Sequence, residues 1–122
     1  MADKWEALHN FWSSFGIPAY DENSVPDDAQ MPYITYMAEI ASFESALLLT
    51  GSIWYRSTRW AEASQKAEEI ARSLASYHLE SVNENEYLFL TQGSPFAQRM
   101  KDEDDTVKRI YINIMAEYFS AY

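Results

Sequence analysis

The chain has 122 residues, no cysteine, and nine basic against nineteen acidic residues, which gives a formal net charge of −10. The absence of cysteine excludes disulfides, thiolate metal sites and cysteine nucleophiles, and the acidic balance disfavours binding to phosphate backbones. Hydrophobic residues make up 48% of the chain, and neither a signal peptide nor a membrane span is recognisable, so we expect one soluble domain over residues 1–122.

Residues 3–15 are predicted to form a helix. Trp5, Leu8, Trp12 and Phe15 recur at helical spacing, and Asp3 is placed to cap the first turn. A loop rich in turn-forming and acidic residues follows over positions 17–31. The sequence "PYITYMAEI" from position 32 then alternates as a strand with one buried face requires.

A second strand is predicted over residues 46–57, as the antiparallel partner of the first. Gly51 in its middle indicates either a bulge or a close approach of another part of the chain. Thr58 is then a candidate N-cap for a helix over about 59–76, whose alanine-rich stripe should face the core.

The remaining segments are predicted to be strands at 87–92, 95–100 and 107–120. A turn at Gly93 and Ser94 separates the first two, and the charged loop "KDEDDT" at 101–106 precedes the third. The predicted order is α-β-β-α-β-β-β. This order is typical of an α+β fold with an antiparallel sheet packed by one or two helices.

None of the chemical motifs reaches the spacing that an enzyme or a metal site needs. His9 and His78 are far apart, and "KDEDDT" lacks the glycine and distal glutamate of a calcium loop, so a solvated hairpin tip is the simpler interpretation. Asp27, Asp28 and Glu39 suggest the carboxylates of a metal-dependent nuclease, but Ala41 stands where its lysine would be. We expect no enzyme activity, cofactor or metal.

The aromatic residues Trp54, Tyr55 and Trp60, with Trp5 and Trp12, permit three interpretations. Core packing is the simplest, and a subunit interface and a platform for a sugar or peptide are the alternatives. Arg56 and Arg59 flank Trp54 and Trp60. Either they pair with carboxylates of a neighbouring subunit or they are surface charges at the start of a helix.

Three motifs give the chain a resemblance to a known family. The sequences "VPDDAQMPYITY" at 25–36, "IWYRST" at 53–58 and "VKRIYINI" at 107–114 resemble, in their order and spacing, the tail-terminator or tail-completion proteins of long-tailed bacteriophages and prophages. The resemblance extends over most of the chain. The segment "ASFESALLLTGS" at 41–52 departs from the family pattern because it has few aromatic residues.

The resemblance implies a non-enzymatic virion protein, made in the host cytoplasm and located at the tail–head junction. Such proteins form a ring, commonly hexameric, that ends tail-tube polymerisation and offers a docking surface to the head connector or stopper. Partners would be further copies of the chain, the tail tube protein and the connector, while the genome passes through the lumen without specific binding. The interface candidates are Asp27, Asp28, Glu39, Trp54, Arg56 and Arg59. The alternatives are a head-completion or stopper protein and a small aromatic-lined binding module.

Overall fold

A computed structural model describes residues 3–37 and 47–120 of the chain. The elements in chain order are α1 (Lys4–Ser13), β1 (Ala19–Asp21), β2 (Tyr33–Tyr36), β3 (Leu47–Arg56), α2 (Ala61–Ser73), β4 (His78–Asn83), β5 (Glu86–Met100) and β6 (Val107–Ser120). They form a six-stranded sheet in the order β1-β2-β3-β6-β5-β4, in which only β1 and β2 are parallel. The predicted α+β class is confirmed.

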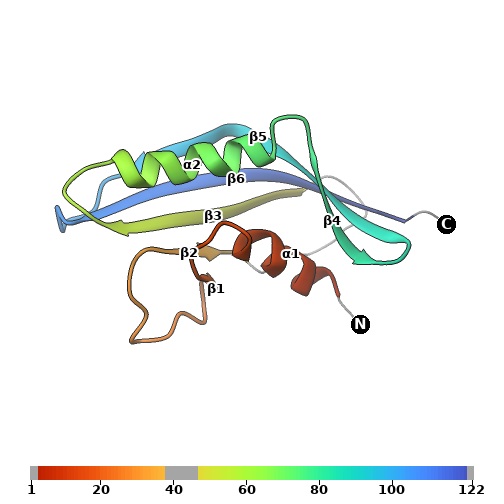
Figure 1. The fold of residues 1–122 in the computed structure, drawn as a ribbon, viewed down its shortest axis with the longest axis horizontal. Helices are drawn as coiled ribbons and strands as arrows, with labels where there is room; N and C mark the ends of the chain where they lie inside the picture. Colours follow the sequence, from red (N-terminus) through yellow and green to blue (C-terminus); the bar gives the residue numbers. More distant parts are fainter. Residues whose placement is uncertain (1–2, 38–46, 121–122) are drawn as a thin grey trace.

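Both helices pack on the same face of the sheet. Helix α2 lies along β3, β5 and β6, whereas α1 contacts β1 and β2 near one edge of the sheet and β4 at the other (Figure 1). Since one short helix reaches both edges, the sheet must curl around it. Neither helix combines the length and apolar character that crossing a bilayer requires, within the residues that the structure describes.

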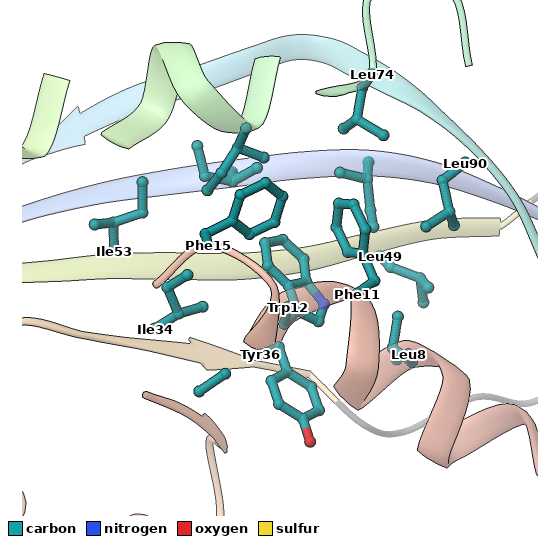
Figure 2. Close-up of a cluster of buried hydrophobic side chains, with 14 of the residues drawn as sticks. Leu8, Phe11, Trp12, Phe15, Ile34, Tyr36, Leu49, Ile53, Leu74 and Leu90 are labelled. Atoms are coloured by element: carbon teal, nitrogen blue, oxygen red, sulfur yellow. The ribbon is translucent and has the colours of Figure 1, made fainter. Parts of the chain in front are cut away.

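The N-terminal helix forms for the reasons that the sequence indicates. The Asp3 carboxylate accepts the backbone N–H of Glu6 at 2.8 Å, which satisfies one of the free donors of the first turn. Leu8, Phe11 and Trp12 are fully buried, and Figure 2 shows them in one cluster with side chains of β2 and β3. Burying this stripe against the sheet is what stabilises so short a helix.

Gly51 marks a close approach of another part of the chain, the Trp12 ring, and not a bulge. Its pairing with β2 and β6 is regular, and a Cβ there would lie only 2.8 Å from Cη2 of Trp12. The Trp12 ring therefore lies directly against the backbone of the sheet. Its neighbours are Tyr36, stacked at 6.4 Å between ring centroids, and Phe11, edge-on at 5.2 Å.

The last strand shows the predicted alternation. Ile110, Ile112, Ile114 and Ala116 are buried on the helix-covered face, and Tyr118 is half-buried beside them. The odd-numbered residues of β6, from Arg109 to Phe119, lie on the other face of the sheet. We call it the helix-free face, because no helix of the described residues covers it.

Two strands were not predicted, and one predicted turn is wrong. β1 lies within the predicted loop and β4 within a stretch assigned no structure, while 87–92 and 95–100 belong to the single strand β5. The Gly93 and Ser94 stretch is a bulge in β5, not a turn, because Asn113 of β6 donates its side-chain N–H to the carbonyl of Pro95 at 2.9 Å and holds the two parts together. A Cβ at Gly93 would lie 2.8 Å from the Asn113 backbone, so the bulge requires glycine.

Some predicted boundaries also differ. The second helix begins at Ala61, and its N-cap is Trp60, not Thr58. The Ser57 hydroxyl accepts the N–H of Arg59 at 3.0 Å, which makes a local turn that delays the helix. β2 ends at Tyr36, one residue before Met37, and residues 38–40 of the first predicted strand lie outside the described residues.

Candidate functional site

The six interface candidates do not gather in one place. Asp27 and Asp28 are exposed in the loop between β1 and β2, where the carbonyl of Pro26 accepts the N–H of Ala29 at 3.0 Å in a turn. Both carboxylates are solvated, and neither makes an ion pair with a described residue. Glu39 lies outside the described residues.

Trp54 is half-buried on the helix-free face. Its indole N–H donates to the Thr35 hydroxyl at 2.9 Å, and the Arg109 guanidinium lies 4.7 Å from the ring centroid. Arg109 in turn donates to the Ser52 hydroxyl at 3.0 Å and lies 5.8 Å from the ring of Tyr111. We call Trp54, Arg109 and Tyr111 the Arg109 site. Its arginine makes no ion pair with any carboxylate of the described residues.

Arg56 is already paired within its own chain. It donates to the Thr106 hydroxyl at 2.9 Å and lies 3.6 Å from Asp104, both in the loop between β5 and β6. Thr106 donates its backbone N–H and then its hydroxyl to Asp104, and these bonds, with the nearby Arg56, lower the pKa of the Asp104 carboxyl. The charged segment 101–106 is therefore a hairpin tip that is tied to the end of β3.

Arg59 is exposed, and its guanidinium has no hydrogen bond or ion pair within the described part of the chain. Its neighbour Trp60 is half-buried, with Arg99 at 5.0 Å and Lys108 at 5.6 Å from its ring centroid. Cations therefore lie over the rings of both Trp54 and Trp60. A sugar or peptide ligand would have to displace them in order to stack there.

The remaining tryptophans divide between core and surface. Trp12 is fully buried and Trp5 is 49% exposed, while Tyr55 is buried beneath α2. Burial, together with the nearby Glu62 and Glu69 charges, raises the pKa of the Tyr55 hydroxyl. The predicted aromatic cluster is thus dispersed, and core packing accounts for Trp12 and Tyr55.

The histidines occupy structural positions. His9 Nδ1 lies 2.8 Å from the Tyr36 hydroxyl, and His78 Nε2 lies 2.9 Å from a Glu80 carboxylate oxygen. Burial, and secondarily the charge of Asp21, raises the pKa of Tyr36. Among the described residues, no three histidine or carboxylate side chains are close enough together to hold a metal ion.

Sequence reasoning missed a group of exposed and half-buried apolar side chains on the helix-free face. Its members are Tyr77, Leu79, Tyr87, Phe89 and Phe119, which we call the aromatic patch. The signal was present in the alternation of β5, because Tyr87 and Phe89 fall on the face opposite to the buried Leu88 and Leu90. It could not be interpreted without β4, which pairs Leu79 with Phe89.

Comparison with known proteins gives a fold and no family. No protein-family model matches the chain, and no curated protein matches its sequence. A chain of the solved structure described as "Virion of native gene transfer agent (GTA) particle" has the same fold, with a TM-score of 0.67 at 15% identity. The match covers 95% of this chain and 94% of that chain. The likeness therefore includes essentially all of the described elements.

Proposed function

We propose that this protein is a non-enzymatic component of a phage-like virion, and specifically a ring-forming tail terminator. The observation that carries the proposal is the fold match over 95% of the chain to a protein of a gene transfer agent virion. The tail-terminator-like motifs add to it. Residues 33–36, 53–56 and 107–114 of these motifs lie in β2, β3 and β6, which are neighbours in the sheet, whereas residues 25–32 lie in the loop before β2.

A terminator has two physical requirements, and the charge of the chain agrees with one of them. Such a ring needs one face that matches the last ring of tube subunits and a second face that does not accept a further ring. A net charge of −10 per subunit would also let the genome pass through a lumen without adhering.

Among the interface candidates, the structure favours Arg59 over Arg56. Arg56 is occupied by Thr106 and Asp104, whereas Arg59 is exposed and has no partner in the described residues. We therefore expect Arg59→Glu to reduce head–tail joining directly. Arg56→Glu should act through the hairpin tip and should also change its local stability.

The deciding experiment removes the gene from the virus or prophage that carries it and inspects the particles by electron microscopy. A terminator predicts filled heads beside unjoined tails of uncontrolled length. Unjoined tails of normal length would instead indicate the head-completion or stopper role. Joined tails of normal length would refute both.

A further inference from the structure

The aromatic patch groups several exposed apolar side chains on one face. Tyr77 is 54% exposed, Phe119 45% and Leu79 43%. With roughly 200 Å² per aromatic side chain, Tyr77 and Phe119 expose about 200 Å² in total. This area is within what a monomer exposes, so the arrangement of the patch and its charged neighbours must carry the argument.

The rings form a connected row from Tyr77, directly before β4, across β5 to β6. Tyr77 stacks on Phe89 at 5.3 Å between centroids, Phe89 lies 6.4 Å from Phe119, and Phe119 lies 6.2 Å from Tyr87. These contacts fix the rings relative to one another. A partner would therefore meet a preformed surface and would order few additional side chains on binding.

An unpaired carboxylate lies beside the patch. Glu117 lies directly opposite Phe89 in the register of β5 and β6, and it is exposed without a hydrogen bond or ion pair to any described residue. Residues 73–98 and 110–120, which include β4, most of β5 and most of β6, contain no lysine or arginine. Lys4 of α1 also lies at this end, over the ring of Tyr118 on the other face of β6. The strands that carry the patch therefore bring acidic but no basic side chains to it.

The other end of the same face holds an arginine without a carboxylate partner. The Arg109 side chain lies over the rings of Trp54 and Tyr111 and makes no ion pair with a described residue, and Met100, paired with Arg109, is 36% exposed. The hairpin tip at this end also carries Asp102, Glu103, Asp104 and Asp105, so the unpaired Arg109, and not the net charge, distinguishes this end.

Glu117 and Arg109 lie on the same face of β6, eight positions apart, and at 3.3–3.4 Å per residue they are about 27 Å from each other. They cannot meet within one chain. Two copies placed head to tail can bring them together. A symmetric contact of patch against patch is disfavoured, because it would bring the two Glu117 side chains of like charge towards each other.

We propose that the aromatic patch of one copy docks on the Arg109 site of a second copy of this chain, with Glu117 facing Arg109. This inference rests on the proposed ring and names the two surfaces that join its subunits. Both surfaces lie on one face, so two antiparallel copies that satisfied both contacts at once would close as a two-fold pair, whereas in a ring each copy uses its two surfaces with two different neighbours. A largest associated species of two copies would therefore overturn the ring contact.

The test is sedimentation velocity of the purified full chain from about 10 μM to about 1 mM, in salt high enough to screen the net charge of −10. We expect reversible self-association. Glu117→Arg and Phe119→Ser should each lower the association constant at least about tenfold. Both positions are exposed, so both variants should fold, and circular dichroism checks this.

Charge reversal on both sides separates a specific contact from a general effect. Arg109→Glu should weaken association, and the double variant E117R/R109E should recover most of it. Glu68→Arg changes the net charge by the same amount on exposed α2 and should leave association unchanged.

A wild-type chain that stays monomeric at 1 mM would overturn the inference, as would a double variant no better than either single one. The inference would also be overturned if the aromatic patch were buried equally at all protein concentrations. Residues of the same chain would then cover the patch, and not a second copy. These failures differ from failure of the proposed function. Self-association can be absent while gene removal still gives long tails, and it can be present while gene removal leaves joined tails of normal length.

Discussion

Substituting Gly51 by alanine should destabilise the protein by about 0.5–2.5 kcal/mol. The added Cβ would lie 2.8 Å from Cη2, 3.0 Å from Cζ2 and 3.1 Å from Cζ3 of Trp12, where carbon contacts are favourable only from about 3.5 Å. Trp12 is fully buried between Tyr36 and Phe11, so its ring cannot turn aside. Overpacking of this kind costs about 1–3 kcal/mol.

An opposing effect reduces that cost. Gly51 does not have a positive φ, so alanine fits the backbone there and restricts the unfolded chain, which contributes about 0.4–1 kcal/mol of stability. Subtracting about 0.5 kcal/mol of this gain from the overpacking cost gives the expected range of about 0.5–2.5 kcal/mol. Urea denaturation followed by circular dichroism measures it, with the slope unchanged and the midpoint lowered.

The Trp12→Phe background identifies the cause. Phenylalanine removes the ring atoms that the new Cβ would strike, and it also removes an indole N–H that has no acceptor in the described structure. In that background Gly51→Ala should cost less than about 0.5 kcal/mol or should stabilise. An equal penalty in both backgrounds, or no penalty in the wild type, would refute the reasoning.

Three further substitutions test other contacts. Gly93→Ala should cost about 2–3 kcal/mol in denaturation, because its Cβ would strike the β6 backbone at 2.8 Å, and backbone cannot rotate away. Lys66→Met should cost about 1–2 kcal/mol, since the ammonium donates to the carbonyl of Phe15 at 2.6 Å and ties α2 to the end of α1. Thr106→Val should raise the pKa of Asp104, because it removes the Thr106 hydroxyl, one of the two Thr106 donors that lower this pKa. Carbon NMR of the Asp104 carboxyl group measures the pKa. In the wild type the stabilisation from this depressed pKa is present above the unfolded value near 4 and is lost as the pH falls through the folded value.

Each of these has a matched control or a contradicting result. Arg72→Gln breaks an exposed pair with Glu68 that is 3.9 Å long, and it should cost less than about 0.5 kcal/mol, against the larger loss for Lys66→Met. Equal losses would show that the Lys66 bond contributes nothing specific. Gly93→Ala without effect would mean that the bulge can shift. An Asp104 pKa unchanged in Thr106→Val would assign the shift to the backbone donor alone.

The parts of the fold that local chemistry specifies could be predicted from the sequence. Asp3 caps α1 through a neighbour three residues away, and the alternation of β6 depends only on the residues of β6. β1 could not be predicted, because three residues carry no period. It exists because the N–H of Ile34 donates to the carbonyl of Pro18 and the N–H of Glu22 donates to that of Tyr36.

Where long-range contacts determine the structure, the local sequence predicted it wrongly or not at all. Gly93 and Ser94 have the chemistry of a turn, yet Asn113, nearly twenty residues later, holds the strand together across them. The same applies to the candidate site. For Arg56 the sequence left open a neighbour's carboxylate or a surface charge at the start of a helix, and the bond it donates to Thr106, fifty residues away in its own chain, could not be read from either. The aromatic patch combines three distant segments that no single motif reveals.

The place of β6 in the sheet has a consequence for how the chain folds during its synthesis. β6 lies between β3 and β5, so residue Leu47 waits for Ala116, 69 positions later, before the edge of β3 that faces away from β2 is paired. Such distant pairing predicts folding in milliseconds to seconds. Until then the edge of β3 is open to the β6 of any neighbouring copy. Wherever many copies are made at once, strand exchange between unfinished chains competes with correct folding, and a high yield would depend on slow synthesis or low temperature.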